Sequence, residues 1–176
     1  MKALLRMNSW QIFLILIGLP ILLEIGTVPV FLSQPIGIVI AYMIVFILVT
    51  VFLLVGWAMT LGTNLHKKLP KNTKLKIGLF KFNIGYFIGY QLLFGAFMAY
   101  VMTTMPESPL FLLIFPFHLY AMFCGLYAMY FISKALVSVE KQEDVDYNQF
   151  GGVFLMLLFF PIGIWFLQPR IQKIFK

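Results

Sequence analysis

Four apolar stretches, each long enough to cross the hydrocarbon core of a membrane as a helix, constrain this chain more than any other feature. A crossing takes about 20 apolar residues at about 1.5 Å per residue. The stretches run near residues 11–32, 36–62, 79–105 and 110–139. Only 11% of the 176 residues are charged, against about 25% in soluble domains, so a soluble enzyme is excluded. The sequence predicts an all-α membrane protein, with residues 1–176 as a single integral membrane domain.

Short proline-containing segments join these stretches in pairs. Ser33-Gln34-Pro35 separates the first from the second, and Pro106-Glu107-Ser108-Pro109 separates the third from the fourth. Connections this short place consecutive helices side by side and antiparallel. We therefore expect four transmembrane helices arranged as two hairpins.

The basic residues indicate how the hairpins are oriented. In a four-span arrangement all 13 Lys and Arg residues fall on one side, and the two opposite loops carry Glu107 but no basic residue. Cytoplasmic loops are enriched in Lys and Arg. We therefore expect a multi-pass protein with both termini in the cytoplasm. The basic residues are too few and too segregated to indicate binding to nucleic acid.

The segment after the fourth stretch has two interpretations. Residues 150–169 are apolar enough for a fifth span, but that span would export the three basic residues that follow it. The favoured alternative is a re-entrant or interfacial helical hairpin over residues 147–176. Asp146 and Gln149 have the spacing of a capping box, which would start a helix running to Phe160, about 20 Å long and too short to cross.

Beyond a break expected at Pro161-Ile162-Gly163, the tail has the pattern of an amphipathic helix. Its apolar residues recur at helical spacing and are Ile164, Leu167, Ile171 and Ile174. Such a helix suits a membrane surface, with Trp165 near the interface. Broken backbone at membrane depth must be covered by protein, so we also expect the hairpin to pack against the bundle.

Glu24 and His118 are the candidate functional groups inside the spans. Each lies eight residues from the same end of the bundle, about 12 Å deep, so the two could meet as an intramembrane polar pair. Ionisable groups at this depth often mark a transport path or a proton relay. A structural interpretation is equally acceptable, in which a buried Glu hydrogen-bonded to His, Tyr or Thr only holds the helices together.

Small residues indicate where helices approach closely. Ala121, Gly125 and Ala128 follow His118 on one helix face, and Gly85 and Gly89 form a GxxxG motif. Such stripes are typical contact sites between membrane helices. The GxxxG partner could be another span or a second copy of the protein. Gln91 is a candidate for lining a polar path, although an interhelical hydrogen bond is the commoner use.

Catalytic and metal-binding patterns are missing from the sequence. It contains no HExxH, GxSxG or P-loop motif. The stretch Asp144-Val145-Asp146-Tyr147-Asn148 imitates half of a calcium loop, but Gln149 replaces the required Gly and Leu155 the closing Glu. We therefore expect no catalytic residue, no metal and no cofactor.

Residues 115–174 carry a resemblance to a known group of proteins. The matching residues include Phe117-His118-Leu119, Tyr130-Phe131-Ile132-Ser133-Lys134 and, above all, the run FFPIGIWFLQPRI at residues 159–171. In these residues the chain resembles a family of small, uncharacterised bacterial polytopic inner-membrane proteins. The resemblance implies a bacterial source and the cytoplasmic (inner) membrane, and it carries no activity.

Two functional hypotheses follow. The first is a non-enzymatic integral membrane protein, an accessory or interaction subunit that contacts the lipid bilayer and a membrane-protein partner or a second copy of itself. The alternative is a small transporter or ion-coupled permease that uses Glu24 and His118.

Overall fold

Helices make up every regular element in residues 2–104 and 111–176, which are the residues that the computed structural model describes. The elements in chain order are η1 (Lys2–Arg6), α1 (Ser9–Phe13), η2 (Leu14–Gly18), α2 (Leu19–Ser33), α3 (Ile36–His66), α4 (Ile77–Thr104), α5 (Phe111–Lys141), α6 (Tyr147–Leu158) and α7 (Phe160–Phe175). The all-α prediction is confirmed for these residues. The turn expected at 106–109 lies outside them.

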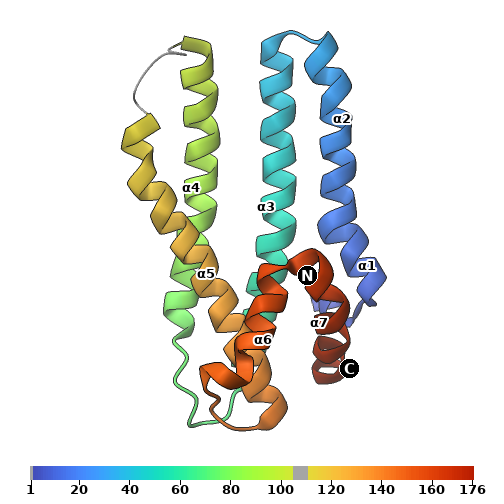
Figure 1. The fold of residues 1–176 in the computed structure, drawn as a ribbon, viewed down its shortest axis with the longest axis vertical. Helices are drawn as coiled ribbons and strands as arrows, with labels where there is room; N and C mark the ends of the chain where they lie inside the picture. The colour runs from blue at the N-terminus through green and yellow to red at the C-terminus, as the bar shows by residue number, and fades with distance from the viewer. Residues whose placement is uncertain (1, 105–110) are drawn as a thin grey trace.

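The long helices stand in two antiparallel pairs, α2 with α3 and α4 with α5 (Figure 1). The connection between α2 and α3 lies at one end of the molecule. The α3–α4 loop, the α5–α6 connection and the C-terminus lie at the other end, which we call the basic end because its loops carry the lysines. Among the described residues, three helical stretches are long and apolar enough to cross a membrane, namely Ser9–Pro29, Ile36–His66 and Ile114–Lys141.

The first of these stretches is made of α1, η2 and α2 without a break. η2 is a π-helical turn, in which the Leu19 N–H donates to the Leu14 carbonyl oxygen five residues earlier. Pro20 follows at once, and a proline cannot donate to the carbonyl four residues before it. The wider turn thus lets the chain pass a proline without ending the helix.

The protein core is concentrated at the basic end. Phe80 of α4 and Phe131 of α5 are both fully buried and stack with ring centroids 4.3 Å apart. Gly62 of α3 makes this packing possible, because a Cβ there would lie 2.4 Å from Cζ of Phe80. By contrast, only 6% of the residues in the most apolar 18-residue stretch of α3 are buried, against 56% in the corresponding stretch of α5. The half of α3 remote from the basic end therefore faces outwards.

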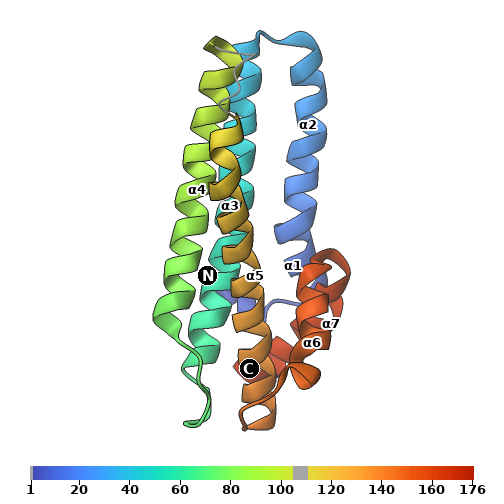
Figure 2. The same cartoon turned by 60° about the vertical axis from the view of Figure 1, so that its left-hand side comes forward.

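The C-terminal helices α6 and α7 form a short hairpin beside the basic end (Figure 2). Gln149 Oε1 accepts a hydrogen bond from the Asp146 backbone N–H at 3.0 Å, which confirms the predicted capping box. The chain turns at Phe159 (φ −98°, ψ 51°), before the predicted break, and Pro161 lies in the first turn of α7. Proline is accommodated there because N–H groups at the start of a helix have no partner within the helix, so the missing N–H of proline costs no helical hydrogen bond.

The apolar face of α7 is covered by protein, in keeping with the expected packing of the hairpin against the bundle. Ile164, Leu167 and Ile171 are fully buried in the core cluster. They pack with η1 and α1, which lie against α7. Periodicity located the apolar face correctly, but it cannot distinguish a protein neighbour from a lipid one.

Candidate functional site

The structure does not bring Glu24 and His118 together. Glu24 is exposed on α2, which packs on α3, whereas His118 is exposed on α5, which packs on α4. Figures 1 and 2 both show α2 and α5 well separated. No hydrogen bond or ion pair joins the two side chains within the described part of the chain. Glu24 instead borders a hollow shared with Tyr42 of α3, whose hydroxyl donates to the Leu23 carbonyl at 3.0 Å.

His118 has a different partner from the one expected. The Tyr90 hydroxyl of α4 lies 2.8 Å from Nδ1 of His118, and the ring of Phe94 flanks the imidazole at 5.8 Å between centroids. The hydrogen bond crosses from one helix to the next, which is the usual role of polar groups between membrane helices. The geometry of His118 therefore supports helix association within the second hairpin.

A second polar contact in this hairpin involves Asn83, which is buried on α4. The Cys124 thiol of α5 donates to Oδ1 of Asn83 at 3.2 Å. Asparagine in an apolar helix could have indicated this crossing from the sequence, but nothing in the sequence selects Cys124 as its partner.

The stripe that follows His118 lies against α4. Ala121 is buried, and a Cβ built on Gly125 would lie 3.8 Å from the Phe87 ring, an ordinary van der Waals contact. Ala128 is half-buried and packs against the core. These small residues thus allow α5 to lie close to α4, as such stripes do in membrane bundles.

The GxxxG motif of α4 has no such neighbour. Gly85 is exposed, Gly89 is half-buried, and a Cβ added to either would meet nothing within 4 Å. Gln91 is half-buried on the same helix. The backbone of α4 at the two glycines is therefore open to whatever surrounds the bundle.

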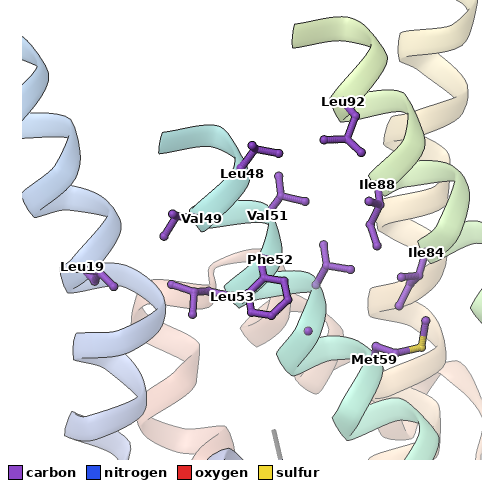
Figure 3. Close-up of a pocket in the computed structure, with 12 residues that line it drawn as sticks. Leu19, Leu48, Val49, Val51, Phe52, Leu53, Met59, Ile84, Ile88 and Leu92 are labelled. Atoms are coloured by element: carbon purple, nitrogen blue, oxygen red, sulfur yellow. The ribbon is translucent and has the colours of Figure 1, made fainter. Parts of the chain in front are cut away.

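An apolar groove of ≈ 620 Å³ adjoins this face of α4. Figure 3 shows side chains of α3 and α4 pointing into a common space, with α2 at its far side. Its lining includes Leu48 and Phe52 of α3 and Ile84, Ile88 and Leu92 of α4. At 100° per residue, Gly85 and Gly89 follow directly beside Leu92 around α4. We call the groove lining together with Gly85 and Gly89 the α3–α4 face.

At the basic end, α7 is fastened to the N-terminal segment by two glutamines one helical turn apart. Nε2 of the fully buried Gln168 donates to the carbonyl oxygens of Leu4 at 3.1 Å and Met7 at 2.8 Å. Gln172 donates to the carbonyls of Arg6 at 3.0 Å and Met7 at 2.8 Å. This glutamine clamp was not predicted from the sequence, although two glutamines four residues apart in an apolar tail are a visible signal for it.

Two ion pairs secure the other side of the hairpin. Arg170 of α7 holds Glu140 of α5 through two hydrogen bonds, from Nε to Oε1 at 2.8 Å and from Nη2 to Oε2. The hydrogen bonds that Arg170 donates to this carboxylate raise the pKa of Arg170 above its ordinary value, and they outweigh the opposing effect of burial. Lys134 pairs with Asp144 at 3.0 Å. Two of the acidic side chains of the basic end are thereby neutralised.

The described residues offer little chemistry beyond these contacts. They contain no group of three His, Cys, Asp or Glu side chains placed to share a metal ion. Comparison of the chain with protein-family models, with curated proteins and with solved structures yields no match. The geometry of the α3–α4 face and of the basic end is therefore the basis for assigning a function.

Proposed function

We propose that this protein is a non-enzymatic membrane subunit that binds a transmembrane helix of another membrane protein on its α3–α4 face. In this proposal the chain crosses a bacterial cytoplasmic membrane four times, with α4 as the third crossing and both termini in the cytoplasm. The α6–α7 hairpin enters from the cytoplasmic side and returns to it.

The topology is supported by where the chain ends and loops lie. The α3–α4 loop and both ends of the α6–α7 hairpin share the basic end (Figure 1). In that arrangement all the basic loops lie on one side of the membrane, which the positive-inside rule assigns to the cytoplasm. The turn at Phe159 also divides residues 150–169 between α6 and α7, which supports a hairpin over a continuous fifth span.

Thiol labelling in intact cells tests this topology. In a Cys124→Ser background we expect Lys173→Cys and Lys71→Cys to react with a membrane-impermeant maleimide only after permeabilisation, and Gln34→Cys to react before it. All three side chains are exposed. Labelling of Lys173→Cys in intact cells would mean that the tail is exported, and the hairpin would have to be replaced by a fifth span.

The single observation that carries the interaction proposal is the open backbone of α4 at Gly85 and Gly89. Absence of a Cβ lets a second helix approach closely and make van der Waals contacts along its length. A lipid chain gains much less from a bare backbone, because it is mobile and packs on side chains equally well. The adjoining ≈ 620 Å³ groove supplies side-chain surface for the same helix.

The partner is tested by purification from native membranes in a mild detergent, followed by native mass spectrometry of the intact particle. We expect a second protein in constant stoichiometry, and we expect Gly89→Leu to release it. Gly152→Leu is the matched control, since a Cβ at Gly152 of α6 also meets nothing within 4 Å and lies away from the face. Retention of the partner by Gly89→Leu, or a particle made only of this chain, would refute the proposal.

The transporter hypothesis receives no support from the structure. It uses Glu24 and His118, and these two residues lie in separate hairpins with different partners. A flux assay in proteoliposomes with Glu24→Gln and His118→Ala provides the direct comparison, and we expect neither substitution to change any flux found.

A further inference from the structure

A hollow of ≈ 670 Å³ at the basic end differs in character from the apolar groove. It lies between η1, the end of α3 and the end of α7, three segments that are far apart in the sequence. The glutamine clamp joins η1 to α7, and Lys68, just after α3, donates to the Ile174 carbonyl of α7. Its lining combines cationic, polar and apolar side chains, which include Arg6, Asn64, Lys68, Lys176, Leu5 and Phe175. We call it the basic pocket.

The positive charges of the basic pocket have no acidic partner among the residues that the structure describes. Arg6 and Lys68 donate only to neutral carbonyl oxygens at the end of α7, Arg6 Nε to Phe175 at 3.1 Å and Lys68 Nζ to Ile174 at 2.9 Å. Neither they nor Lys176 forms an ion pair with a carboxylate in the part of the chain that the structure describes. The nearby carboxylates of Glu140 and Asp144 are instead paired with Arg170 and Lys134.

The contacts with α7 hold the cations in place and leave most of their donors unused. A guanidinium has five N–H donors and an ammonium three, and each side chain spends one on a carbonyl. Lys68 is further positioned over the Phe175 ring, 5.3 Å from its centroid. Two or more fixed cations around one hollow are suited to a phosphate, whose oxygens accept several charge-assisted hydrogen bonds.

The remaining lining favours a phosphate that carries an apolar body. Leu5 and Phe175 give the pocket an apolar wall. Trp10 is exposed on the adjoining α1, and tryptophan is a residue type enriched at membrane interfaces. The side-chain Nδ2 of Asn64 donates to the Thr60 carbonyl at 2.7 Å, which leaves the side-chain Oδ1 to accept a hydrogen bond from a headgroup hydroxyl. A free anion would use the cations but not these groups.

We propose that the basic pocket binds the headgroup of an anionic phospholipid, with the phosphate held by Arg6, Lys68 and Lys176. The bound lipid then joins η1, α3 and α7 at the cytoplasmic surface. This inference rests on the proposed membrane orientation but not on the proposed partner helix, and its test needs no partner. Basic pockets beside membrane helices on this side are typical sites for such headgroups.

The test is native mass spectrometry of the purified full chain titrated with palmitoyl-oleoyl phosphatidylglycerol, with phosphatidylcholine of the same chains, or with inorganic phosphate. We expect a saturable phosphatidylglycerol adduct and at least about tenfold weaker binding of phosphatidylcholine. Each cation near an anionic headgroup contributes about 1 kcal/mol, or about fivefold in affinity. Lys68→Gln with Lys176→Gln should therefore weaken phosphatidylglycerol binding by about 25-fold.

Two variants make the result specific to the pocket. Lys71→Gln with Lys74→Gln removes the same charge from exposed lysines of the neighbouring loop, and it should change binding by less than about twofold. Lys176→Gln alone should cost about fivefold, and its side chain makes no hydrogen bond or ion pair with other described residues that could affect folding.

Three results would each overturn the proposal. Equal weakening by the two double variants would show diffuse surface attraction instead of a site. Displacement of the lipid by inorganic phosphate at a similar concentration would show a site for a free anion. Equal binding of phosphatidylcholine would show that the headgroup charge is not recognised.

Discussion

Gly163, in the first turns of α7, is a glycine at which the structure leaves no room for a Cβ. A Cβ at this position would lie 1.8 Å from the Met156 carbonyl oxygen and 2.5 Å from its carbonyl carbon, whereas real Cβ contacts essentially never fall below 3.0 Å. Both atoms belong to the backbone, so no side-chain rotation relieves the clash. Gly163→Ala must therefore push α7 away from α6 by more than about 1 Å.

The cost of this displacement can be worked from the contacts of α7. Overpacking of this kind costs about 1–3 kcal/mol. The displacement also strains the two hydrogen bonds of Gln168 to the N-terminal segment, worth about 1 kcal/mol each. The better helix propensity of alanine returns about 1 kcal/mol. We expect Gly163→Ala to lower the free energy of unfolding by about 2–4 kcal/mol.

Gly152→Ala supplies the control on the same hairpin. A Cβ at Gly152 of α6 meets nothing within 4 Å, so only the helix propensity changes and we expect a gain of about 0.5–1 kcal/mol. Thermal unfolding of both variants in one mild detergent gives the sign. Amide hydrogen exchange of residues 2–8 reports whether the clamp has opened. A Gly163→Ala protein as stable and as protected as Gly152→Ala would refute the packing argument.

Three further substitutions test contacts that hold the bundle together, each by the same unfolding measurement. Arg170→Gln should lower the free energy of unfolding by about 1 kcal/mol because its pair with Glu140 is partly exposed. In a double-mutant cycle, most of this cost should disappear when Glu140→Gln is already present. Tyr90→Phe should cost about 0.6 kcal/mol, the average for a hydrogen bond between membrane helices, and loss of more than about 2 kcal/mol would contradict a simple contact with His118. Phe80→Ala should cost about 3–5 kcal/mol because the ring is fully buried against Phe131, and a neutral result would show that this core is not tightly packed.

The helical class and the start of the C-terminal hairpin could be predicted because they depend on local signals. Helix length follows from uninterrupted apolar sequence, and the capping box at Asp146 involves residues three positions apart. The π-helical turn before Pro20 could not be predicted with the same rules, since it is one of several ways for a helix to pass a proline.

The side-chain neighbours could not be predicted because depth along a helix does not fix direction around it. Glu24 and His118 are at similar depths, yet each is directed by a different helix partner. The same uncertainty applied to α7, whose apolar face is covered by protein, and to Gly85 and Gly89, whose face is open. Each outcome depends on which helices pack together, and the hydrophobic periodicity of a single helix does not identify its neighbours.

The distribution of packing is compatible with the proposed docking of a helix on the α3–α4 face. The clamp, the ion pairs and the fully buried aromatic pair all lie toward the basic end. In the most apolar 18-residue stretch of α3, by contrast, only 6% of the residues are buried. In a membrane the exposed apolar half is solvated by lipid at little cost, so it need not be covered for the fold to persist. A helix that docks there exchanges lipid contacts for protein contacts without disturbing the core. Substitutions at exposed positions of the α3–α4 face, such as Phe52 and Leu92, should therefore change assembly while leaving unfolding of the monomer nearly unchanged, and substitutions in the clamp should do the reverse.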